Sequence, residues 1–82
     1  MGSIEKLLDK MKRASGPLPF DEVAKVCDHF FGSPRMRGSH RIYQMPWRGD
    51  PRINIQNRHG EVAAYQVKQV LKAIERLEEE HA

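Results

Sequence analysis

The chain has 82 residues, 39% of them hydrophobic, and a formal net charge of +3, which suits one small domain and leaves no room for two. It contains no apolar stretch near the roughly 20 residues of a membrane-spanning helix and no basic-then-apolar secretory signal, so we expect a soluble, cytoplasmic protein. Its one cysteine, Cys27, cannot form an internal disulfide, and its four histidines have no carboxylate or thiolate at ligand spacing, so we expect neither a metal nor another cofactor.

The first half of the chain has the apolar period of two amphipathic helices. The first helix is expected over residues 3–14, before the breaker Ser15-Gly16-Pro17, and the second between Pro19 and Gly32. Their apolar faces consist of Ile4, Leu7, Leu8 and Met11 in the first helix and Val23, Val26, Cys27 and Phe30 in the second. In this position Cys27 is interpreted as a small core residue rather than a nucleophile.

The middle of the chain changes to the two-residue period of strands. Residues 39–45 and 52–56 alternate polar and apolar side chains, and the segment between them has turn chemistry, which predicts an antiparallel hairpin. Residues 35–37 are a possible third strand, limited at its start by Pro34. A third helix is expected over residues 64–80.

The positive charge is concentrated in this middle segment. Residues 32–60 contain six arginines and one acidic residue, a balance of 6 − 1 = +5, and no lysine. Because the planar guanidinium group binds phosphate oxygens in pairs and stacks on bases, this segment predicts a surface for RNA. On the third helix, Lys68, Lys72 and Arg76 form a separate stripe that either extends this surface or is simply solvated.

The order helix, helix, two or three strands, helix predicts an α+β domain in which helices cover one face of a small antiparallel sheet. Two short motifs stand beside these strands: Gly38-Ser39-His40 begins one strand, and Arg58-His59-Gly60 lies between the last strand and the third helix. Glycine allows close backbone approach, serine supplies a hydroxyl, and histidine exchanges a proton near neutral pH.

With Ile53-Asn54-Ile55 as the second strand, this combination resembles the HicA family of toxin–antitoxin RNA endonucleases over about Pro19 to Leu77. The resemblance implies a double-stranded-RNA-binding-like fold, with a three-stranded antiparallel sheet and two helices on one face. On this basis residues 17–82 are expected to form a HicA-like RNA-interacting domain, and residues 1–16 an accessory helix in front of it. The chain departs from the family in that extra helix and in residues 62–66, which lack the usual proline or glycine followed by threonine.

The same resemblance implies a toxin that cuts mRNA without the ribosome, is neutralised by a HicB-like antitoxin protein, and depends on His40. RNA can be cut without metal when a base deprotonates the 2′-hydroxyl and an acid protonates the leaving oxygen. An imidazole, with its ordinary pKa near ~6.5, can serve in either role. His40 is therefore the candidate catalytic acid or base, and Arg37, Arg41 and Arg58 are candidate phosphate-binding residues.

Three further residues could contact RNA, and each also has a structural interpretation. His59 is either a second proton-transfer group or a turn or helix-capping residue; Tyr43 and Trp47 either stack on bases or pack within the hairpin. The predicted RNA-binding set comprises Arg37, Ser39, Arg41, Tyr43, Arg52, Arg58, His59 and Lys68.

The direction in which His40 points decides its role. Strand alternation places His40 on the same face as Ile42 and opposite Tyr43. If Ile42 faced the helices, His40 would be a partly buried structural residue. Two further functions therefore remain open: an RNA-binding module without catalysis, which would not need His40, and a domain that binds only protein.

Overall fold

The computed structural model describes residues 3–46 and 52–80, and these form three helices and two small sheets. Trp47 and the turn that contains it lie outside the described residues. The helices are α1 (Ser3–Arg13), α2 (Phe20–Phe31) and α3 (Ala64–Glu80), in close agreement with the expected ranges. At the end of α2, Gly32 adopts a φ of 85° and its amide donates to the Asp28 carbonyl at 3.2 Å, so the expected stop at this glycine is confirmed.

The larger sheet is antiparallel with the order β2-β3-β4. Its strands are β2 (Arg35–Arg37), β3 (His40–Gln44) and β4 (Arg52–Gln56), so residues 35–37 do form a strand. In the register, His40 lies opposite both Arg37 and Gln56, and Ile42 lies opposite both Arg35 and Asn54. This is the α+β arrangement expected from the sequence.

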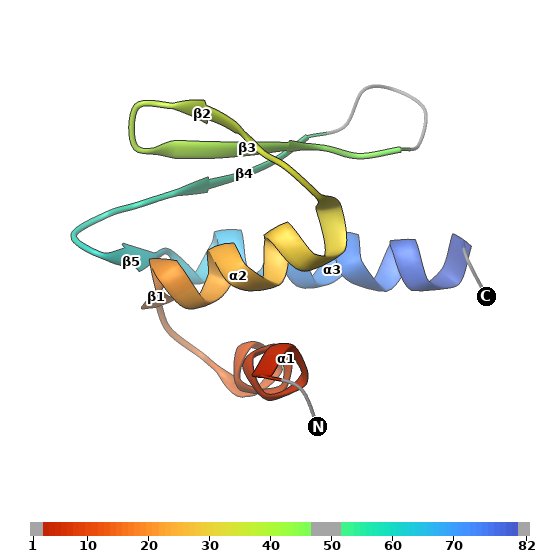
Figure 1. Cartoon of the computed structure of the whole chain (residues 1–82). Coiled ribbons are helices and arrows are strands. Elements are labelled where there is room, and N and C mark those ends of the chain that lie inside the picture. Colours follow the sequence, from red (N-terminus) through yellow and green to blue (C-terminus); the bar gives the residue numbers. More distant parts are fainter. Residues whose placement is uncertain (1–2, 47–51, 81–82) are drawn as a thin grey trace.

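The elements lie in three layers (Figure 1). The sheet forms one layer, α2 and α3 lie side by side against one of its faces, and α1 packs on the far side of these two helices. No described helix covers the other face of the sheet. Within the described part of the chain, no helix has the length and apolar character that crossing a membrane requires.

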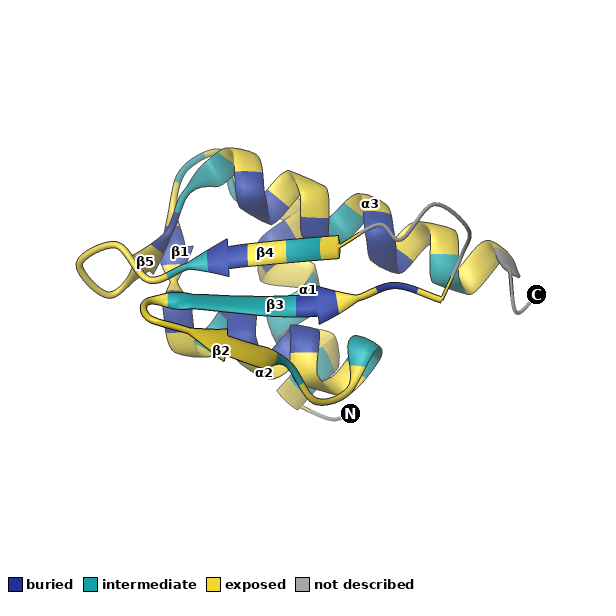
Figure 2. Cartoon of the chain, turned by 90° about the horizontal axis from the view of Figure 1, so that it is seen from above, coloured by how far each residue is buried: buried dark blue, intermediate teal, exposed yellow. Residues whose placement is uncertain are grey.

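The core lies between the sheet and the helices, and buried segments occur on β3, β4, α2 and α3 (Figure 2). Tyr43 and Ile55 are buried on the sheet side, and Val26 and Val70 are buried on α2 and α3. Met11 of α1 is also buried, so the first helix belongs to the same packed unit. The apolar positions that gave each helix its 3.6-residue period are those that the fold buries fully or in part.

A second, two-stranded sheet was not expected. β1 (Leu18–Pro19) pairs antiparallel with β5 (Glu61–Val62), and the Phe20 amide donates to the Gly60 carbonyl at 2.8 Å. These contacts tie the start of α2 to the segment just before α3. They hold the two covering helices together at one end of the molecule.

Candidate functional site

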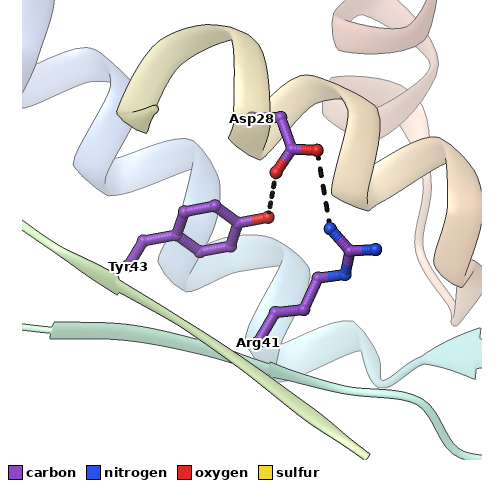
Figure 3. Close-up of polar contacts among 3 residues, drawn as sticks. All are labelled: Asp28, Arg41 and Tyr43. Carbon is purple, nitrogen blue, oxygen red and sulfur yellow. Dashed lines mark hydrogen bonds and ion pairs between the residues drawn. The ribbon is translucent and has the colours of Figure 1, made fainter. Parts of the chain in front are cut away.

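The side chains of β3 show which face of the larger sheet is turned toward the helices. The Tyr43 side chain is fully buried and its hydroxyl donates to Asp28 Oδ1 of α2 at 2.6 Å (Figure 3), so Tyr43 faces the helices. Because successive residues of a strand point to opposite faces, His40 and Ile42 face away from the helices. The possibility that Ile42 points at the helices, which would have made His40 structural, is therefore excluded.

We call the uncovered side of the larger sheet the open face. Cross-strand partners share a face, so the register places eight side chains there. They are Arg35, Arg37, His40, Ile42, Gln44, Arg52, Asn54 and Gln56. Three of these residues are arginines and none is acidic, so the open face has the charge that attracts a polyanion.

His40 lies near one end of the open face and is half-buried there. Arg37 and Gln56 flank it on the neighbouring strands, and its ring Nδ1 lies 2.8 Å from Asn54 Oδ1. Asn54 was not among the residues selected from the sequence. The alternation in residues 52–56 indicates that Asn54 lies on the opposite face from Ile53 and Ile55. Its contact with His40, however, depends on the register between two strands that are separated by a long turn.

The two sequence motifs meet at this end of the sheet. The Asn57 amide donates to the Ser39 carbonyl at 2.9 Å, which joins the turn after β4 to the turn that contains Gly38. The Asn57 side chain in turn accepts a hydrogen bond from the Gly60 amide at 2.8 Å. Ser39 and the 57–60 turn are therefore neighbours, although they lie far apart in the sequence.

Arg58 and His59 belong to this turn and are exposed. Arg58 exchanges two backbone hydrogen bonds with Glu61, at 2.8 and 2.9 Å. His59 has a φ of 51°, a left-handed conformation that histidine adopts more readily than most residues other than glycine. The turn-forming interpretation of His59 thus has direct support in the backbone.

Arg52 occupies the opposite end of the open face, where it pairs with Gln44. Four residue steps along β3 separate the two ends, or about 13 Å. Arg52 also borders a groove of about 700 Å³ between β4 and α3, together with Lys72 and Arg76. Part of the α3 stripe thus adjoins the basic surface, although Glu75 and Glu79 line the same groove.

Two residues of the predicted RNA-binding set lie on the wrong side of the sheet. Arg41 points inward: its Nη1 is 3.5 Å from Asp28 Oδ2 (Figure 3). Its guanidinium also lies 5.6 Å from the Phe20 ring centroid. Tyr43 has no exposed surface with which to stack on a base. Burial, together with the hydrogen bond to Asp28, raises the pKa of the Tyr43 hydroxyl. Both residues are corrected to bracing contacts between β3 and α2.

The remaining residues that the sequence singled out lie away from the open face. Lys68 is exposed on α3, an element that packs against the opposite face of the sheet. Cys27 has no exposed surface, and burial, with the Asp28 carboxylate, raises the pKa of its thiol to about 12. Because a nucleophilic cysteine must form the thiolate, the core interpretation of Cys27 is confirmed.

Comparisons of the chain with protein-family models, with curated proteins and with solved structures gave no significant match.

Proposed function

We propose that this chain is a HicA-type toxin: an RNA endonuclease that cuts mRNA in the cytoplasm, without metal or ribosome, and is neutralised by a HicB-like antitoxin. The observation that carries the proposal is the position of His40. It lies on the open face, whose eight described side chains include no acidic residue, directly opposite Arg37, with one ring nitrogen held by Asn54. A proton-transfer group beside a phosphate-binding group is what cleavage next to a 2′-hydroxyl requires.

The proposed reaction is an internal transesterification. His40 takes the proton of the 2′-hydroxyl, the 2′-oxygen bonds to phosphorus, and the bond from phosphorus to the 5′-oxygen breaks. The departing oxygen takes a proton from water, and the resulting hydroxide removes the proton from the His40 imidazolium. The products are a 2′,3′-cyclic phosphate and a 5′-hydroxyl, and Arg37 stabilises the negative charge that develops at phosphorus.

The fold is compatible with the double-stranded-RNA-binding-like arrangement that we propose for it. The order α2, β2, β3, β4, α3, with the two-residue strand β5 before α3 and both helices against one face of the antiparallel sheet, supports this proposal. Such domains recognise RNA through phosphates and 2′-hydroxyls more than through base sequence. A surface with three arginines suits that mode of binding.

Purified protein incubated with single-stranded and structured RNA in excess EDTA tests the activity. We expect wild type to cut, His40→Ala to be inactive, and His29→Ala to cut like wild type, because His29 is an exposed histidine on α2, away from the open face. RNA with a 2′-deoxy sugar at the cut site should resist cleavage. Equal cutting by wild type and His40→Ala, or cutting only after metal is added, would refute the proposal.

Binding without cleavage is the outcome that would select the other RNA-related function. If wild type binds RNA in a salt-sensitive manner but never cuts it, and His40→Ala binds equally well, the chain is an RNA-binding module. Failure to bind any RNA at low salt would instead favour a domain that binds only protein. The three outcomes separate cleanly because binding and cleavage are measured on the same RNA.

The antitoxin is proposed to act by covering the open face. A protein that does so must bring acidic groups to Arg35 and Arg37, since buried, unpaired charges are costly. Co-expression with the product of an adjacent HicB-like gene, followed by purification, tests the pairing. A stable complex that still cuts RNA would contradict inhibition by covering this face.

A further inference from the structure

The side chains of His40 and Asn54 form a diagonal pair across β3 and β4. Asn54 lies directly opposite Ile42, and His40 lies two residues before Ile42 on the same face. Their facing atoms, His40 Nδ1 and Asn54 Oδ1, are 2.8 Å apart, a normal hydrogen-bond distance. Among the described residues, the His40 ring forms no hydrogen bond other than this one.

The chemistry of the two groups fixes the direction of that bond. An amide oxygen can only accept a hydrogen bond, and a neutral imidazole carries one proton, on either Nδ1 or Nε2. With Asn54 Oδ1 as the acceptor, the proton resides on Nδ1. The lone pair is then on Nε2, the nitrogen that remains for a substrate.

We propose that Asn54 is a positioning residue, which holds His40 in the Nδ1-protonated tautomer so that Nε2 acts as the general base toward the 2′-hydroxyl. This inference rests on the proposed function and narrows it, because the sequence left His40 as either acid or base. In the first step Nε2 accepts the proton, as the reaction above requires. A histidine protonated on Nε2 could not do so without first changing tautomer.

The choice of an amide at this position suits the open face. A carboxylate would also accept the Nδ1 proton, but it would place a negative charge beside Arg37 and against the incoming phosphate. Asparagine orients the ring without that repulsion. The pair thus supplies a directed base without adding a negative charge to the eight described side chains of the open face.

The tautomer can be measured directly on the full chain without RNA. Long-range proton–nitrogen NMR correlation of ¹⁵N-labelled wild type, at a pH where the ring is neutral, should show His40 with a protonated Nδ1 and an unprotonated Nε2. Asn54→Leu should shift the proton toward Nε2, the nitrogen preferred by a free imidazole. Asn54→Asp retains an accepting oxygen and should keep the wild-type tautomer.

Gln56→Leu is the matched control for the spectrum, because it removes the amide directly opposite His40 in the register. It should leave the His40 tautomer unchanged. An Nε2-protonated His40 in wild type, or an Asn54→Leu spectrum identical to that of wild type, would overturn the proposal. A flipped Asn54 amide, with its nitrogen toward His40, would produce the first of these results.

Cleavage kinetics complete the test. We expect Asn54→Leu to lower kcat about 10-fold to 100-fold with little change in KM, by analogy with the loss of a hydrogen-bond partner that orients a metal-ligating histidine. If wild type cuts RNA and Asn54→Leu cuts equally fast, the positioning role fails while the endonuclease stands. If wild type cuts no RNA, the proposed function itself fails, whatever the spectrum shows.

Discussion

The Tyr43 hydroxyl donates a 2.6 Å hydrogen bond to Asp28 Oδ1, and this contact joins the central strand of the larger sheet to α2. Arg41 Nη1 lies 3.5 Å from the other oxygen of the same carboxylate. One aspartate thus braces two inward-facing residues of β3, and by fixing which residues face inward it also fixes which ones face outward. The same alternation that turns Tyr43 toward Asp28 turns His40 toward the open face.

Removal of the Asp28 carboxylate should therefore destabilise the fold. Asp28→Ala leaves the buried Tyr43 hydroxyl without its acceptor, and we expect a loss of about 1–3 kcal/mol in the free energy of unfolding. Urea denaturation, monitored by circular dichroism, measures this loss of stability. Lys25→Ala, at an exposed position of the same helix, is the control and should change stability by less than about 0.5 kcal/mol.

Stability should fall at alkaline pH because of the buried thiol and phenol. Burial raises the pKa of Cys27 from 9.0 to about 12, and it raises the pKa of Tyr43 above its ordinary 10.0. The fold thus favours the neutral, protonated forms. Their contribution is complete below pH 9 and is lost as the pH rises from 9 toward 12, by up to about 1.4 kcal/mol per pH unit for Cys27.

Urea midpoints measured between pH 8 and pH 11 check this dependence. Cys27→Ala should show a shallower decline than wild type, and the comparison uses slopes because the substitution also removes core volume. In the native protein at pH 8, Cys27 should resist iodoacetamide and should react once the chain is unfolded. Rapid alkylation of the native protein would show that the thiol is accessible.

Arg37 should contribute to RNA affinity through phosphate. In a His40→Ala background, where RNA is not cut, Arg37→Ala should weaken binding several-fold. The slope of log K against log salt should become shallower by about 0.7 for single-stranded RNA, as expected for one lost contact. Arg13→Ala provides the control, because Arg13 is exposed on α1 and pairs with Asp9; an equal loss there would indicate a diffuse charge effect.

The turn at residues 57–60 should respond in opposite ways to substitution at two neighbouring positions. His59→Gly should raise stability by up to about 1 kcal/mol, because it relieves the left-handed backbone at φ 51°. Gly60→Ala should lower it by about 1 kcal/mol, because Gly60 has a φ of 85°. Thermal unfolding distinguishes the two; a loss in both variants would mean that the His59 side chain itself stabilises the turn.

The sequence predicted the helices and strands well because their signal is local. The apolar periods of residues 4–11 and 67–74 and the alternation around Ile53 and Ile55 each lie within one element. The two-residue pairing of Leu18 with Val62 has no period to detect and joins residues distant in the chain. It was therefore missed.

The site was predicted only in part, for a related reason. Arg37, Ser39, His40 and Arg52 do lie on or beside the open face, as their alternation allowed. Arg41 and Tyr43 were assigned to RNA binding but face the helices, where both contact the Asp28 carboxylate and where Tyr43 and Met45 of the same alternation are buried. The contact between Asn54 and His40 could not be foreseen, because it depends on the register of β3 against β4.

The two edges of the larger sheet affect the tendency of the protein to self-associate through strand pairing. The backbone N–H of Gln56 points away from β3. It donates to Oε1 of Gln66, a buried side chain of α3, at 3.1 Å. At the other edge of the sheet, β2 is three residues long with arginine at both ends. Short, charged or covered edges discourage strand-to-strand aggregation. The sheet thus keeps a broad polar face available to a ligand while its margins remain poor templates for joining further strands.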